Sequence, residues 1–208
     1  MKTVRISSIF CVCVLLSFSA RAGSQKPSPS PAKCSLTLAQ SPIVRGLKLG
    51  QSPSDVQNLI APDGDERSLE ILRLGSGSAL FRDDFVGVRE QTIYSSLIDS
   101  ERLKGTRTIS LRYLDDKLAS FSIDYGSEVK WQSTAHFTAA IAEQLHLPTV
   151  GWGSADSRIK LRLNCDGFFV ETFAYQSSEL KVEKIDLETE ISMRRTERER
   201  KKRVEFKP

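Results

Sequence analysis

The sequence predicts an α+β fold, in which an antiparallel β-sheet carries helices packed on one of its faces. Two observations lead to this prediction. Segments in which apolar and polar residues alternate come in groups joined by short turns, as is typical of antiparallel strands. Segments with apolar residues three or four positions apart precede these groups, so the order helix then strands occurs twice. We therefore expect two helix-plus-meander halves, without a residue-level repeat, followed by a charged C-terminal helix.

The N-terminus has the pattern of an export signal. Lys2 and Arg5 form a short basic region, residues 9–18 are mostly apolar, and residues 20–22 form a small-residue cleavage site. The apolar run is too short to span a bilayer, so we expect it to be removed near Ala22. The mature protein is then periplasmic or secreted.

The remaining chain divides by composition. A Ser- and Pro-rich stretch cannot pack and is predicted to be a linker. The next 150 or so residues fit one domain. The predicted organisation is a signal peptide at 1–22, a linker at 23–33, a single globular α+β domain at 34–187 and a charged, basic helix or tail at 188–208.

The mature chain is almost neutral. The full sequence has a formal charge of +4, but three basic residues belong to the signal, which leaves 27 basic and 26 acidic residues. This balance argues against nucleic acid as a partner. Positive charge is concentrated after residue 187, where eight Lys or Arg residues accompany five Glu.

Two cysteines remain after the signal is removed, Cys34 and Cys165. An oxidising compartment favours a disulfide between them. The bond would close a loop of roughly 130 residues and hold the N-terminal segment on the domain. The alternative is a pair of separate buried thiols.

The first helix has the clearest local signals. Ser52 suits an N-cap, Pro53 suits the first helical position, and Asp55 stands where a capping box places an acid. We expect a short helix over Pro53–Ala61. The apolar positions of residues 65–84 fit either a helix or a strand.

A β-hairpin is predicted next, with strands at Thr108–Tyr113 and Leu118–Tyr125 around the turn residues 115–117. The residues expected to face the core are Ile109, Leu111, Phe121, Ile123 and Tyr125.

The second half begins with a helix over Trp131–His146, because apolar residues recur there at steps of four. Strands follow at Ile159–Asn164, Phe168–Tyr175 and Leu180–Asp186. The last segment, Glu188–Phe206, is charged on all sides and predicts a solvated helix. Glu and Arg or Lys stand four apart in it in the favourable order, and the residues available to dock it are Ile191, Met193, Val204 and Phe206.

The sequence contains no pattern that assigns catalysis, a metal or a cofactor. His136 and His146 are the only histidines, lie in no catalytic motif, and are interpreted as structural. The acid pairs at 83–84 and 115–116 are interpreted as turns rather than as a pair of catalytic carboxylates. The glycine-containing stretches 75–78 and 151–153 are predicted to be loops.

Six residues are candidates for binding a partner. Trp131 and Trp152 would give an aromatic surface, although packing at the edge of the core is the interpretation we favour for them. Cations of the last helix would contact an acidic protein or anionic headgroups, and the alternative is a solvated helix laced with ion pairs. These cations are Arg194, Arg198, Lys201 and Lys202.

The string RGLKLGQSPSDVQNLI, residues 45–60, resembles the opening of envelope proteins related to the outer-membrane assembly lipoprotein of the SmpA/OmlA type. A Leu-Gly-Met-Ser/Thr motif precedes a Val-containing helix in that family, and Gln51 replaces the Met here. Gly46 and Gly50 permit the tight backbone geometry around this motif. The resemblance implies a fold similar to the β-lactamase inhibitor protein, with short helices on one face of an antiparallel sheet, and a role in binding proteins. The lipid-bearing Cys of that family is missing.

We therefore expect an exported, non-enzymatic module of the bacterial cell envelope that binds or scaffolds another envelope or secreted protein, without a cofactor. The first alternative is a secreted inhibitor of an extracytoplasmic enzyme, which would need exposed aromatics on the open sheet face. The second is a small secreted hydrolase. Contact of the C-terminal segment with a membrane surface is not favoured, because its charge is nearly balanced.

Overall fold

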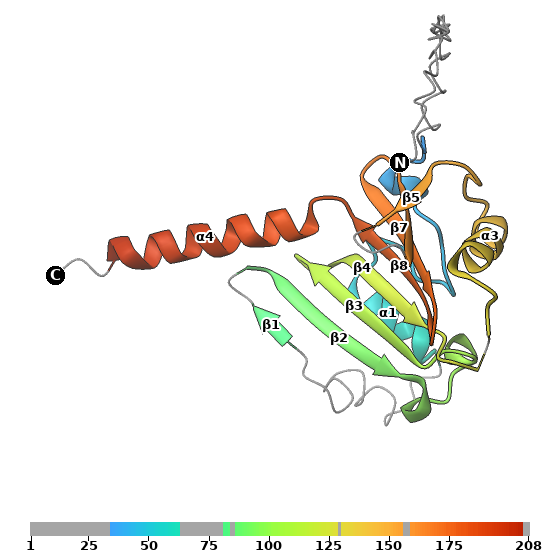
Figure 1. Cartoon of the computed structure of the whole chain (residues 1–208). Helices are drawn as coiled ribbons and strands as arrows, with labels where there is room; N and C mark the ends of the chain where they lie inside the picture. The colour runs from blue at the N-terminus through green and yellow to red at the C-terminus, as the bar shows by residue number, and fades with distance from the viewer. Residues whose placement is uncertain (1–33, 63–80, 84–85, 129, 156–158, 206–208) are drawn as a thin grey trace, which may run out of the picture. The chain divides into compact units, whose positions relative to one another are not determined.

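The computed structural model describes residues 34–62, 81–83, 86–128, 130–155 and 159–205 (Figure 1). The predicted signal peptide and linker, the ambiguous stretch up to residue 80, Asp84 and Phe206 lie outside these residues. The helices are α1 (Pro53–Ile60), α3 (Thr134–Gln144) and α4 (Leu187–Glu205). The strands are β1 (Phe81–Asp83), β2 (Val88–Tyr94), β3 (Thr108–Leu114), β4 (Lys117–Asp124), β5 (Trp152–Ser154), β6 (Lys160–Asn164), β7 (Phe168–Ala174) and β8 (Ser178–Lys184).

The described strands form an 8-stranded sheet in the order β1-β2-β3-β4-β8-β7-β6-β5. Every pair of neighbours is antiparallel. Each half of the sheet is therefore a four-strand meander, and the halves meet where β4 pairs with β8. α1 precedes the first meander and α3 precedes the second, so the predicted α+β fold with two helix-plus-meander halves is confirmed.

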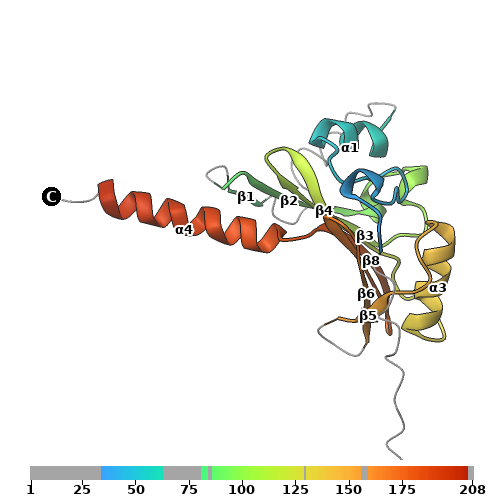
Figure 2. The same cartoon turned by 90° about the horizontal axis from the view of Figure 1, so that it is seen from above.

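Helices α1 and α3 cover the same face of the sheet (Figure 2). Buried residues of both helices belong to one apolar cluster with residues of the strands. The cluster includes Val56 and Ile60 of α1, Phe137 and Ile141 of α3, and Ile109, Leu111, Phe121, Ile123, Leu163, Val170 and Val182 of the sheet. Four of the five predicted core residues are buried, and Tyr125 is half-buried against the same cluster.

The start of α1 follows the predicted capping box. Ser52 Oγ accepts a hydrogen bond from the backbone N–H of Asp55 at 3.2 Å, and Asp55 Oδ2 accepts one from the N–H of Ser52 at 2.8 Å. Gly46 has a φ of +89°, and a Cβ there would lie 2.5 Å from a methyl group of Leu59. A larger residue at this position would have to adopt a left-handed backbone conformation that favours glycine, and it would displace the end of the Leu59 side chain.

The β3–β4 hairpin turns at Asp115 and Asp116, whose φ values of 50° and 55° suit a two-residue turn. The interpretation of this acid pair as a turn is confirmed. Lys117 already pairs with Leu114, so the turn is one residue shorter than predicted. The register shifts between Arg112 and Tyr113, as in a β-bulge.

Several predicted boundaries in the second half are wrong by a few residues. α3 begins at Thr134 because Ser133 caps it, its side chain accepting a hydrogen bond from the N–H of His136 at 3.1 Å. β8 begins at Ser178, two residues before the predicted Leu180. The stretch 151–153 is not simply a loop, because Trp152–Ser154 forms β5 and pairs with β6.

The C-terminal helix α4 docks through its first turns. Leu187 and Ile191 are 1% and 3% exposed, and they pack with Val86, Val88 and other apolar residues of the sheet. The prediction that Ile191 docks the helix is confirmed. Met193 is 61% exposed, so its predicted docking role is wrong.

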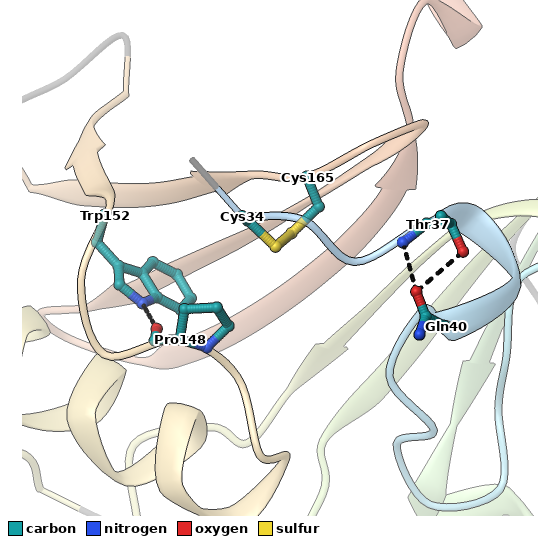
Figure 3. Close-up of a disulfide and its surroundings, with 6 residues drawn as sticks. All are labelled: Cys34, Thr37, Gln40, Pro148, Trp152 and Cys165. Atoms are coloured by element: carbon teal, nitrogen blue, oxygen red, sulfur yellow. Dashed lines mark hydrogen bonds between the residues drawn. A yellow bond between two sulfur atoms is a disulfide. The ribbon is translucent and has the colours of Figure 1, made fainter. Parts of the chain in front are cut away.

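A disulfide joins Cys34 to Cys165, with 4.6 Å between their Cα atoms (Figure 3). The predicted pairing is confirmed. The N–H of Asp166 also donates to the carbonyl of Leu36 at 2.9 Å, so the segment after Cys34 is held by the disulfide and by the backbone of the β6–β7 turn. This pairing ties the start of the described chain to the second half of the sheet.

Candidate protein-binding surface

The sheet has a second face, opposite α1 and α3, which we call the open face. Alternate residues of each strand point to it. Cross-strand pairing arranges these residues in rows that run across the sheet. The central row is Thr92, Ser110, Ser122, Lys181, Glu171 and Arg162. The row on one side of it is Glu90, Arg112, Ser120, Glu183 and Phe169. The row on the other side is Tyr94, Thr108, Asp124, Glu179, Phe173 and Lys160.

Most side chains in these rows are charged or carry a hydroxyl group, and the aromatic ones are Tyr94, Phe169 and Phe173. A groove of about 380 Å³ crosses the open face, with small hydroxyl residues of β3 and β4 in the middle and charged residues of β7 and β8 beside them. Residues of the groove include Ser110, Ser122, Lys181, Glu183 and Glu179. One sheet thus has a sealed apolar face and a polar, concave one.

Glu171 is the centre of an ion-pair network on β6 and β7. Its carboxylate accepts hydrogen bonds from Arg162 at 2.7 Å and from Lys160 at 3.2 Å. Burial alone would raise the pKa of Glu171, but the hydrogen bonds from Arg162 and Lys160 outweigh it, and the pKa is lowered overall. The carboxylate therefore stays charged although Glu171 is only 7% exposed.

A second network surrounds Phe169. The Arg162 guanidinium carbon lies 4.2 Å from the centre of the Phe169 ring, and Lys181 Nζ lies 5.7 Å from it. Lys181 also pairs with Glu183 at 2.8 Å, and Glu183 accepts a hydrogen bond from Ser120 at 2.8 Å. These contacts hold Arg162, Lys181 and Glu183 in defined positions on the open face.

The first turn of α4 reaches the edge of this surface. Arg112 pairs with Glu90 at 2.7 Å and also binds Glu188 of α4. Burial alone would lower the pKa of Arg112, but these carboxylates raise it overall. The helix therefore borders the open face where Val88, Leu114 and Ala119 lie beneath Leu187 and Ile191.

Arg194, a predicted partner-binding residue, forms an intramolecular clamp. Its guanidinium donates to both carboxylate oxygens of Asp115, at 2.8 and 2.7 Å, to the carbonyl of Val86 at 3.0 Å, and to Glu190 at 2.7 Å. The hydrogen bond with Asp115, helped by Glu190, raises the pKa of Arg194, and the same contact lowers the pKa of Asp115. The arginine fixes α4 to the β3–β4 turn.

The other predicted cations of α4 lie beyond this clamp. Both views show the helix continuing past the sheet (Figures 1 and 2). The side chains of Lys201 and Lys202 are 71% and 55% exposed, and they lie 4.0 and 3.6 Å from glutamates of the same helix. Arg198 is half-buried. These three residues form a separate charged surface, away from the groove.

Both tryptophans lie with the helix-covered face. Trp131 is tilted against Phe137, with 5.0 Å between ring centres, and Trp152 Nε1 donates to the carbonyl of Pro148 at 2.8 Å (Figure 3). Both rings are half-buried against the apolar cluster. The structure brings neither of them to the open face.

Among the residues that the structure describes, no group of three or more His, Cys, Asp or Glu side chains is placed to hold a metal ion. His136 is exposed and lies edge-on to Trp131, and His146 is exposed after the end of α3. No helix within the described ranges is long and apolar enough to cross a membrane.

Comparison of the chain with protein families, with curated proteins and with solved structures gives no match. The residues that sequence reasoning missed are those of the open face. Their signal is present in Ser178–Lys184, where Glu179, Lys181 and Glu183 alternate with buried residues and predict a strand with one polar face.

Proposed function

We propose that this chain is an exported, non-enzymatic binding or scaffolding module of the bacterial cell envelope, and that it holds a partner protein on its open face. The observation that carries the proposal is the difference between the two faces of one sheet. One is sealed by α1 and α3, and the other presents a polar groove in which three of the four glutamates, Glu90, Glu171 and Glu183, are held by ion pairs. Surfaces with fixed charges lose less side-chain entropy when they bind.

Two further observations support export and binding. The Cys34–Cys165 disulfide fits an oxidising compartment, in agreement with the basic and apolar pattern of residues 1–22. The resemblance of residues 45–60 to the SmpA/OmlA type points to modules that act by binding proteins. Gln51, which replaces the Met of that motif, accepts from the N–H of Lys48 and donates to the carbonyl of Gly46, both at 2.9 Å, so it stabilises the same loop by hydrogen bonds.

The test is site-specific photocrosslinking of the full chain in its native host. A photoreactive phenylalanine analogue is placed at Ser110 or Ser122 on the open face, and at Ala139 on α3 as a matched control. The proposal predicts adducts with one protein from the two open-face positions and none of the same mass from Ala139. Equal adducts from both faces, or adducts from Ala139 alone, would contradict it.

A secreted inhibitor is the second candidate, because two tyrosines are exposed among the described residues, and one of them, Tyr94, lies in an outer row of the open face and is 36% exposed. Tyr175 is 76% exposed in the β7–β8 turn. Phe169, in contrast, is 8% exposed beneath Arg162. If the crosslinked partner is an enzyme, Tyr175→Ala should raise the inhibition constant of this chain for that enzyme at least tenfold. An unchanged inhibition constant would reject the inhibitor function and leave the binding function in place.

A further inference from the structure

One carboxylate of the open face has no counter-charge. Four open-face acids bind a cation, and these pairs are Glu90 with Arg112, Asp124 with Arg107, Glu171 with Arg162, and Glu183 with Lys181. Glu179 has no hydrogen-bond or ion-pair partner among the residues that the structure describes. The groove lining contains four glutamates and three cations, so Glu179 accounts for its excess negative charge.

The neighbours of Glu179 leave this charge uncompensated. Asp124 is directly opposite on β4, but its own charge is already compensated by Arg107, and it is an acid that cannot pair with Glu179. Lys181, two residues along the same strand, pairs instead with Glu183 and lies over Phe169. A cation brought from outside would supply the counter-charge that the described neighbours of Glu179 do not provide.

The same position offers an aromatic ring and free hydroxyls. Phe173 is directly opposite Glu179 on β7 and is half-buried on the open face. Ser122 and Ser110 lie in the adjacent row and are half-buried in the groove. Neither hydroxyl has a hydrogen-bond partner within the described part of the chain. An aromatic face, a carboxylate and hydroxyl acceptors together suit an ammonium or guanidinium group.

We propose that the groove recognises a lysine or arginine side chain on an exposed segment of the partner protein. The cation pairs with Glu179, stacks on Phe173, and donates a hydrogen bond to Ser122. This inference rests on the proposed function and adds the chemistry by which the open face selects its partner. A partner segment with an acid at that position would meet Glu179 and Asp124 and be rejected.

The test is an NMR titration of the ¹⁵N-labelled mature protein with two short peptides, Ac-Gly-Ser-Arg-Ser-Gly-NH₂ and the same peptide with Glu at its centre. The proposal predicts saturable shifts of the amides of Glu179, Phe173 and Ser122 with the arginine peptide alone. Glu179→Gln should weaken this binding about tenfold. Glu143→Gln, which removes an exposed carboxylate of α3, should leave it unchanged. Equal binding of both peptides, or equal binding by wild type and Glu179→Gln, would overturn the inference.

Photocrosslinking from Ser110 separates this inference from the function on which it rests. If adducts form with wild type and persist unchanged with Glu179→Gln, the open face binds a partner but does not select a cation, so the inference fails alone. If wild type forms no adduct from the open face, the proposed function itself fails. An adduct with the mass of a dimer would show that a second copy of this chain occupies the open face, and it would contradict the proposal that the partner is a different protein.

Discussion

Removal of the Cys34–Cys165 disulfide should strongly destabilise the fold. The bond closes a loop between residues separated by 131 positions. On the chain-entropy model this constraint destabilises the unfolded state by about 5 kcal/mol, and measured losses for native disulfides are about 2–5 kcal/mol. For a chain of this size the free-energy loss corresponds to a melting temperature lower by about 5–20 °C.

The assay is urea denaturation followed by far-UV circular dichroism. It compares the oxidised mature protein, the same protein reduced, and the double variant Cys34→Ala with Cys165→Ala. The reduced protein and the double variant should both lose at least about 2 kcal/mol of unfolding free energy. The oxidised protein should show no reactive thiol until it is reduced. A double variant within about 0.5 kcal/mol of the oxidised protein, less than measurements on native disulfides give, would refute the reasoning.

Three other changes have expected outcomes. Glu179→Gln should change the unfolding free energy by no more than about 0.5 kcal/mol, because Glu179 has no partner among the described residues. A loss of more than about 1 kcal/mol in thermal melting would contradict this and indicate an intramolecular partner for Glu179. Arg194→Ala should speed hydrogen–deuterium exchange of the backbone amides of α4, because the contact of Arg194 with Asp115 holds this helix on the sheet, and the amides of the strands should stay protected. Unchanged exchange in α4 would show that the apolar contacts of Leu187 and Ile191 are enough to hold the helix. The pKa of Glu171 is lowered in the folded state, so its contribution to stability is present above the ordinary carboxyl pKa and is lost as the pH falls through the lowered value. Glu171→Gln should therefore flatten the stability profile below pH about 4.5, as urea titrations at several pH values would show.

Local signals predicted the elements that depend on local chemistry. The cap at Ser52 and the turn at Asp115 are set by residues within a few positions of each other, and both are where the sequence places them. The disulfide followed from the predicted export and from the two cysteines that remain after the predicted signal peptide. The alternation of apolar residues likewise fixed which residues of β3 and β4 face the core.

Features that depend on distant pairing could not be obtained in this way. β5 has only three residues, one of which is Gly153, and it is a strand only because β6 pairs with it. The open-face groove requires the register of β4 on β8, which places Ser120 beside Glu183, 63 positions away. The sequence also shows Arg194 as one of several cations of a charged helix, and only the fold shows that Asp115 binds it.

The claim that the open face is the binding surface is tested most directly by one comparison of affinities. Ser122→Tyr fills the groove, and Ala139→Tyr makes a matched addition to the exposed surface of α3. Binding of each variant to the crosslinked partner is measured by isothermal titration calorimetry. The account predicts a loss of affinity of at least about tenfold for Ser122→Tyr and none for Ala139→Tyr. Wild-type affinity in Ser122→Tyr, with a loss in Ala139→Tyr, would contradict it.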